Sequence, residues 1–314
     1  MALSNTYDTT NPGSAVSNRE DLLDVITTLA PQETPILSMA PKRKATATFH
    51  EYTVDSLSAP STAGVSEGAD VTAFVDKFSG RARLGNYVQK IRRPFMVSDL
   101  QQAVDSVGPA KIAQAEMKAV KELKRDIEAT ICSNNDRSAE NGGGTAYALR
   151  GLGDWIDSGG PSDVPAAYRT PAASIHASGA FTETVLNSLI TSIYRVNGMA
   201  NELTLVADTA LRAVIADFAR TSGSTNTVYR QIQQSADTAT IKLTVDFYES
   251  DNGMVSIVNM NPDCAPDTTN KDTGYLLNPE YMGVADLIPM RRVTRPMRIG
   301  LRHGGLHFRD RDHW

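Results

Sequence analysis

Cysteine is scarce in this sequence, and long apolar runs are missing. The only cysteines are Cys132 and Cys264, too few for a disulfide framework, and no CxxC spacing indicates a zinc site. No stretch approaches the ~18 consecutive apolar residues of a membrane span, and the N-terminus lacks the basic and apolar regions of a signal peptide. We therefore expect a soluble protein with reduced thiols that is made in the cytoplasm, contacts no membrane and is not exported by the standard route.

Positive charge is also in deficit. The 31 lysines and arginines are outnumbered by 36 acidic residues, so the formal net charge is −5, which argues against a dedicated nucleic-acid-binding protein. The length of 314 residues, with 41% hydrophobic and 21% charged residues, is ordinary for a soluble globular protein of one or two domains.

Catalytic and cofactor-binding motifs are absent as well. The triple glycine at 142–144 lacks the Lys-Ser/Thr that a phosphate-binding loop needs, and no Gly-x-Ser-x-Gly elbow is present. His303 and His307, with Asp310, Asp312 and His313, have the residue types of a metal site, but glycines interrupt them and a charged tail explains them equally well. The sequence predicts a protein that is not an enzyme and has no catalytic, cofactor-binding or metal site.

A short amphipathic helix is expected near the N-terminus. Residues 17–20 have the spacing of a capping box, and Leu22, Ile26 and Leu29 then fall on one helical face before Pro31. This apolar stripe must pack against its own subunit or against a neighbouring one.

A long polar excursion follows. Residues 44–54 and 83–91 have strand-like patterns, but between 55 and 73 the only large apolar side chains are Leu57, Val65 and Val71. Such a segment buries too little apolar surface to order itself, and an isolated hairpin is marginally stable. We expect another copy of the chain to order this arm.

The charges of the arm are sorted along the chain. Acidic residues come first and basic residues second, so they can pair across the hairpin ladder or between subunits. The acidic set is Glu51, Asp55, Glu67, Asp70 and Asp76, and the basic set is Lys77, Arg81, Arg83, Lys90, Arg92 and Arg93.

A long amphipathic helix is predicted after Gly108-Pro109. Its apolar stripe recurs at spacings of three and four: Ala113, Met117, Val120, Leu123, Ile127 and Ile131. On its polar side we expect i,i+4 ion pairs of Lys118 with Glu122 and of Lys124 with Glu128.

The rest of the chain alternates helices and strands and predicts an α/β or α+β core. We expect helices at 182–194 and 208–219, and strands at 203–207, 240–248, 254–258, 275–277, 282–285 and 293–301. Seven arginines lie between 291 and 311, and in the last strand Arg292, Arg298 and Arg302 share one face.

The order of these parts resembles the major capsid proteins of tailed bacteriophages, and most closely the podophage-like group with the Hong Kong 97-like fold. The resemblance covers roughly residues 18–310. It is carried by residues 34–39 (TPILSM), 67–70 (EGAD), 85–91 (GNYVQKI), 121–128 (KELKRDIE), 151–155 (GLGDW) and 277–281 (LNPEY).

The resemblance implies an α+β chain in five parts. These are an N-terminal arm at 1–43, an extended β-hairpin loop at 44–98, a peripheral domain with a long spine helix at 99–149, an axial α/β domain at 150–262, and the return strands of the peripheral domain with the C-terminus at 263–314.

The resemblance also implies a virion protein that assembles in the host cytoplasm as pentamers and hexamers of an icosahedral shell around double-stranded DNA. Expected partners are other copies of the chain, a portal and packaged DNA. A separate scaffolding or decoration protein is a further candidate partner. Some relatives carry an N-terminal scaffolding domain, for which we expect no room here. Lysine crosslinking, known in some relatives, has no marker at Lys77 or Lys90. An encapsulin-like compartment and a small nucleic-acid-binding module are the alternatives.

We hypothesise that Glu67 or Asp70 at the tip of the arm meets a basic patch on a neighbouring subunit, formed by the spine helix or by residues 291–302. The candidate residues for contacts between subunits are Glu67, Asp70, Lys77, Arg81, Arg83, Arg92, Arg93, Arg292, Arg298 and Arg302.

Overall fold

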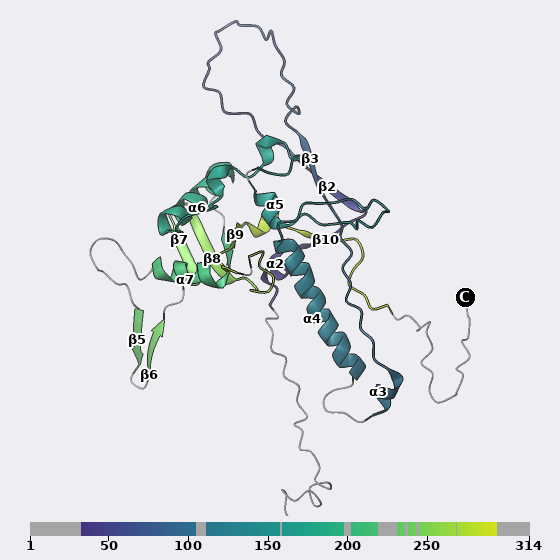
Figure 1. The fold of residues 1–314 in the computed structure, drawn as a ribbon. Coiled ribbons are helices and arrows are strands. Elements are labelled where there is room, and N and C mark those ends of the chain that lie inside the picture. Colours follow the sequence, from purple (N-terminus) through teal and green to yellow (C-terminus); the bar gives the residue numbers. More distant parts are fainter. Residues whose placement is uncertain are drawn as a thin grey trace, which may run out of the picture.

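The computed structural model describes residues 33–104, 111–157, 159–197, 202–218, 231–235, 238–242, 245–267 and 269–293. The helix expected at 17–29, the Gly108-Pro109 start, residues 294–301 of the last strand and the 303–313 histidine cluster lie outside this range. So do Arg298 and Arg302. Helices and sheets are both present in the described part (Figure 1), so the chain has the α+β character expected from its sequence.

The predicted hairpin is present. β2 (Phe49–Val54) pairs antiparallel with β3 (Ala82–Tyr87), from Phe49 opposite Tyr87 to Val54 opposite Ala82. Residues 55–81 connect the two strands without helix or strand and project from the body (Figure 1). A three-residue strand before the hairpin, β1 (Lys42–Lys44), pairs in parallel with β10 (Val284–Asp286).

The long helix is α4 (Lys111–Cys132). It follows the short α3 (Asp99–Ala103), in which the Ser98 hydroxyl caps the first turn by accepting from the amide of Gln101. The C-terminal end of α4 is covered by α2 (Pro35–Met39), whose Ile36 is fully buried, and by α5 (Leu152–Ile156).

A four-stranded mixed sheet forms the centre of the second half. Its order is β7 (Phe247–Ser250), β8 (Gly253–Asn259), β4 (Leu203–Ala207), β9 (Gly274–Leu277). β4 runs parallel to β8 and antiparallel to β9, and each of its residues is buried.

Helices α6 (Glu183–Asn197) and α7 (Thr209–Phe218) cover one face of this sheet. Asp208 directly precedes α7, is buried, and its carboxylate accepts from the amide of Thr209 at 2.6 Å. The buried core on this face consists of Leu186, Ile190, Leu203, Leu205, Ala207, Leu211, Ile215, Val255 and Ile257.

The other face of the sheet packs on the α2–α4 junction. Val206, Tyr275 and Leu277 lie in one buried cluster with Ile36 and Cys132, and the Tyr275 hydroxyl donates to the carbonyl of Cys132 at 2.9 Å. The long helix and the sheet therefore share a core, although 70 residues or more separate them in sequence.

One local prediction needs correction. The single strand expected at 240–248 is replaced by two strands: β6 (Thr238–Lys242), which forms a hairpin with β5 (Gln231–Ser235), and β7 in the main sheet. Three short 3-10 helices lie in the connections, at Ala166–Tyr168, Ala172–Ser174 and Pro279–Tyr281.

Candidate inter-subunit surface

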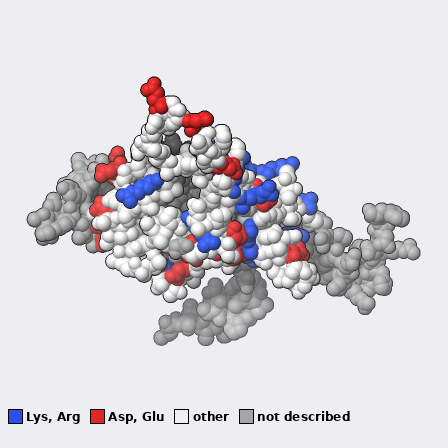
Figure 2. Space-filling view, turned by 90° about the horizontal axis from the view of Figure 1, so that it is seen from above, with Lys and Arg blue, Asp and Glu red and all other residues white. Residues whose placement is uncertain are grey.

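The loop at 55–81 exposes side chains that a subunit would normally bury. The exposed fractions of Leu57 and Phe74 are 99% and 91%. Glu67 and Asp70 near the tip are exposed too, and Figure 2 shows acidic side chains at the outer end of the projection. The loop thus combines apolar and acidic groups on a surface that the described part of its own subunit leaves uncovered.

Ion pairs close the base of this loop. Arg81 donates to Asp55 at 2.8 Å, and Arg83 lies 3.8 Å from Glu51 on the opposite strand. The hydrogen bond from Arg81 lowers the pKa of Asp55. The expectation that acidic and basic residues pair across the hairpin is confirmed at these two positions, which engages Arg81 and Arg83 within the subunit.

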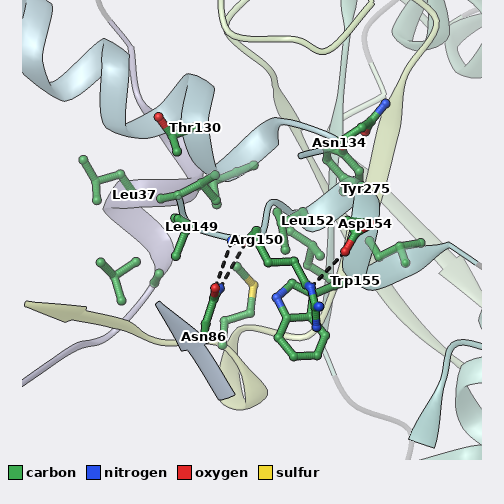
Figure 3. Close-up of a pocket in the computed structure, with 18 of the residues that line it drawn as sticks. Leu37, Asn86, Thr130, Asn134, Leu149, Arg150, Leu152, Asp154, Trp155 and Tyr275 are labelled. Atoms are coloured by element: carbon green, nitrogen blue, oxygen red, sulfur yellow. Dashed lines mark hydrogen bonds and ion pairs between the residues drawn. The ribbon is translucent and has the colours of Figure 1, made fainter. Parts of the chain in front are cut away.

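The hairpin is fixed to the body through β3. The side chain of Asn86 accepts from the amide of Arg150 at 2.9 Å and donates to the carbonyl of Arg150 at 3.1 Å (Figure 3). The guanidinium of Arg137 donates to the carbonyl of Gly85 at 2.6 Å and lies over the ring of Phe49. These contacts hold the root of the loop at a defined place on the subunit.

Arg150 is the centre of a charge cluster behind the hairpin. Its side chain is only 1% exposed and contacts Asp136 at 2.7 Å, Asp163 at 2.6 Å and Asp154 at 2.9 Å. Its guanidinium also lies 4.8 Å from the centre of the Trp155 ring (Figure 3). Three acids and an aromatic face therefore compensate one buried charge.

The pKa values of two acids in this cluster, Asp163 and Asp154, are shifted in opposite directions. Burial opposes ionisation of Asp163, but hydrogen bonds and charge from Arg150, with the charge of Arg137, outweigh it and lower the pKa. Burial and then the nearby charge of Asp136 raise the pKa of Asp154. The cluster is a structural anchor of the loop, and sequence reasoning missed it; the i,i+4 spacing of Arg150 and Asp154 was the available signal.

Two basic candidates lie along α4. Arg93 makes a two-bond contact with Asp126 at 2.5 and 2.6 Å, and Arg292 donates to Glu116 at 2.8 Å. The pair with Asp126 raises the pKa of Arg93. The segments around Arg93 and Arg292, far apart in sequence, thus both contact α4, at positions ten residues apart along the helix. Lys77 and Arg92 are exposed.

The polar side of α4 differs from expectation at one pair. Lys118 lies 4.0 Å from Glu122 as predicted, but Glu128 does not pair with Lys124. Its buried carboxylate instead accepts from the amides of Ile36 at 2.9 Å and Leu37 at 2.8 Å. Sequence spacing could not reveal this role, because it depends on α2 arriving from 92 residues earlier.

No metal-type cluster was found in the described part of the chain. Both cysteines are free thiols in buried positions. Among the described helices, none is long and apolar enough to cross a bilayer.

The family of the chain is given by a sequence comparison. A family model described as SU10 major capsid protein matches residues 3–297. The chain belongs to this family. It is therefore a tailed-phage major capsid protein, a structural component of the virion, as the resemblance predicted. The match does not favour the encapsulin alternative.

A structural comparison finds a chain described as "Capsid of native GTA particle computed with C5 symmetry". It shares 13% sequence identity with this major capsid protein, with a TM-score of 0.44 and coverage of 66% of each chain, just under two thirds. No curated protein sequence matches at a significant level.

Proposed function

We propose that copies of this major capsid protein assemble as pentamers and hexamers into an icosahedral head that encloses double-stranded phage DNA. Assembly takes place in the host cytoplasm and includes a portal, with the five-part Hong Kong 97-like division of the subunit given above. Membership in the SU10 major capsid protein family supports the proposal.

The observation that carries this proposal is the exposure of the loop at 55–81. Apolar side chains such as Leu57 and Phe74 are almost wholly in solvent, which is unfavourable unless a partner covers them. The root of the loop is fixed through Arg150, so the loop starts from a defined place on the subunit. A neighbouring subunit is the partner that a shell provides.

The receiving surface is the side of α4 that carries Arg93 and Arg292. Both arginines are already paired with acids of α4, but their side chains remain about half exposed, at 46% and 50%. Arg92, the residue before Arg93, is exposed and adds positive charge. Glu67 and Asp70 of a neighbour supply the opposite charge, which fixes register more than it adds affinity.

Charge reversal at the loop tip tests this contact. Glu67→Lys combined with Asp70→Lys should reduce particle formation, measured by negative-stain microscopy and sedimentation, and leave the circular dichroism of the subunit unchanged. The matched control is Glu249→Lys with Asp251→Lys, which makes the same change of charge at exposed sites on the β7–β8 hairpin. If the tip variant and the control assemble equally well, the proposed contact of Glu67 and Asp70 with a neighbouring subunit is wrong.

The contents of the particle test the rest of the proposal. Particles from infected cells should contain nuclease-protected double-stranded DNA and pentamers and hexamers in averaged images. Particles filled with a protein cargo would instead identify a compartment shell. A chain that stays monomeric under all assembly conditions, with and without a scaffolding protein, would contradict a shell function.

A further inference from the structure

The glycines at 142–144 follow an asparagine in an exposed loop. The ends of this loop are joined by an isolated antiparallel bridge between Ser138 and Ala148, and Asn141 and Gly142 are both exposed. Gly142 has a φ of +69°, a conformation that favours glycine. No other part of the described chain lies within 4 Å of the place that a Cβ on Gly142 would occupy. The backbone after Asn141 is therefore free of steric contacts, and its next amide nitrogen carries no neighbouring side chain.

The side chain of Asn141 is folded onto the backbone that follows it. Its carboxamide oxygen accepts from the amide of Gly143 at 2.9 Å and from the amide of Thr145 at 3.2 Å. Asparagine commonly bonds the backbone two residues on in this way. Two amide donors on one carbonyl oxygen also stabilise negative charge that develops on it, as the donors of an oxyanion hole do. The carbonyl carbon of this side chain is thereby activated for attack by a nucleophile.

We propose that Asn141 is a site of spontaneous deamidation. The backbone nitrogen of Gly142 attacks Cγ of Asn141 and gives its proton to water. The new N–Cγ bond closes a succinimide ring, and the side-chain Nδ2 leaves as ammonia. Water then opens the ring at either carbonyl and leaves aspartate or isoaspartate at position 141. In sum one water is consumed and one ammonia is released, no enzyme or cofactor is needed, and the loop gains one negative charge.

Asn252-Gly253 provides a comparison within the same chain. The carboxamide of Asn252 donates to the hydroxyl of Thr191 on α6 at 2.9 Å, and the side chain is only partly exposed. Gly253 is the first residue of β8 and pairs with Ser250. Here a distant helix holds the carboxamide and a ladder holds the backbone, so this turn must open before it can react. The remaining Asn-Gly pair of the sequence, at 197–198, lies partly outside the described residues.

Incubation of the full-length unassembled subunit in mildly alkaline buffer tests the proposal. Trypsin releases residues 138–150 as one peptide in which Asn141 is the only asparagine, so mass spectrometry assigns the conversion to this site. We expect Asn141 to react at least about tenfold faster than Asn252 in the folded chain, because Asn252 must first lose its hydrogen bond and its place in the turn. Equal rates at the two sites, or no conversion at Asn141, would overturn the proposal.

A synthetic peptide of residues 138–150 separates the effect of the folded loop from that of the Asn-Gly sequence. If the amides of Gly143 and Thr145 activate the carboxamide, Asn141 reacts in the folded subunit at least as fast as in the peptide. A rate in the folded subunit about tenfold below that of the peptide would contradict the activation, because order alone slows a reaction that needs local opening.

Gly142→Ala tests the role of the attacking residue. The left-handed conformation disfavours a residue with a Cβ, so we expect the rate at Asn141 to fall about tenfold. Gly64→Ala is the matched control, since a Cβ there also meets nothing within 4 Å and its φ is not in the left-handed region. It should leave the rate unchanged. Equal rates at Asn141 in the two variants would contradict attack by the nitrogen of Gly142. The reaction takes place within one subunit and does not depend on the assembly of a shell.

Discussion

The carboxylate of Glu128 on α4 accepts a hydrogen bond of 2.9 Å from the backbone amide of Ile36, which precedes it by 92 residues. The other carboxylate oxygen accepts a second hydrogen bond of 2.8 Å from the amide of Leu37. Through this contact the first turn of α2 is held on the long helix, next to the core that both share with the central sheet.

Removing this carboxylate should destabilise the subunit. In Glu128→Ala two buried or partly buried amides lose their acceptor, and we expect a loss of about 1–3 kcal/mol of unfolding free energy. Urea denaturation of the unassembled subunit, followed by circular dichroism, measures it. Glu122→Ala is the control, because it removes only an exposed ion pair and should change stability by less than about 1 kcal/mol. Equal losses of unfolding free energy in the two variants would show that the amide contact stabilises the subunit no more than an exposed ion pair does.

The same residue predicts a pH dependence. Burial raises the pKa of Glu128, although the two amide bonds oppose the rise, so the folded subunit binds this proton more tightly than the unfolded chain. The stability that this proton adds is complete below the unfolded value of about 4.3 and is lost as pH rises through the raised pKa. The difference in unfolding free energy between wild type and Glu128→Gln should therefore fall as pH rises across that window. A difference that stays constant from pH 4 to 8 would exclude the raised pKa.

Arg150 should matter more to stability than any arginine of the loop base. Arg150→Met leaves three aspartates without their shared partner, and since these acids are partly exposed we expect a loss of about 2–3 kcal/mol, below the range for fully buried pairs. Arg81→Met, whose ion pair with Asp55 is exposed, should unfold nearly as the wild type does. Denaturation curves that reverse this ranking would contradict the anchoring role of Arg150.

The two thiols should be unreactive while the subunit is folded. Burial raises the pKa of Cys264 to about 11 and raises that of Cys132 further, so neither supplies much thiolate at neutral pH. Iodoacetamide should label neither residue in buffer and both in urea, as read by mass spectrometry. Rapid labelling of the folded subunit would show that the core around α4 opens.

Patterns of local periodicity predicted the hairpin and the long helix, because both depend on residues close in sequence. The strand-like patterns at 44–54 and 83–91 and the three-four spacing from Ala113 to Ile131 were sufficient, although the observed strands are shorter, at 49–54 and 82–87. Contacts between distant segments were not predictable in this way. The sequence predicted that Glu128 would pair with Lys124 on the surface, and it predicted no role for Arg150. Both residues are buried by segments that come from other parts of the chain.

For the candidate inter-subunit surface too, local contacts could be predicted and contacts between distant segments could not. Sorting of charge correctly predicted pairs across the hairpin for Glu51 and Asp55. It did not predict that Arg93 and Arg292 would each find an acid on α4, since that requires the path of the chain in space. Contact of Glu67, Asp70 and Lys77 with a neighbouring subunit remains a prediction.

The way in which the hairpin is rooted also determines where mechanical load would act. Because both strands lead into the same loop, a pull on the tip draws β2 and β3 in one direction and leaves the ladder between them unsheared. The tension passes instead to the two Asn86–Arg150 bonds and to the bond from Arg137 to Gly85. From Arg150 the force reaches Asp163. A force applied at the tip of the loop would therefore act on the buried charge cluster behind the hairpin.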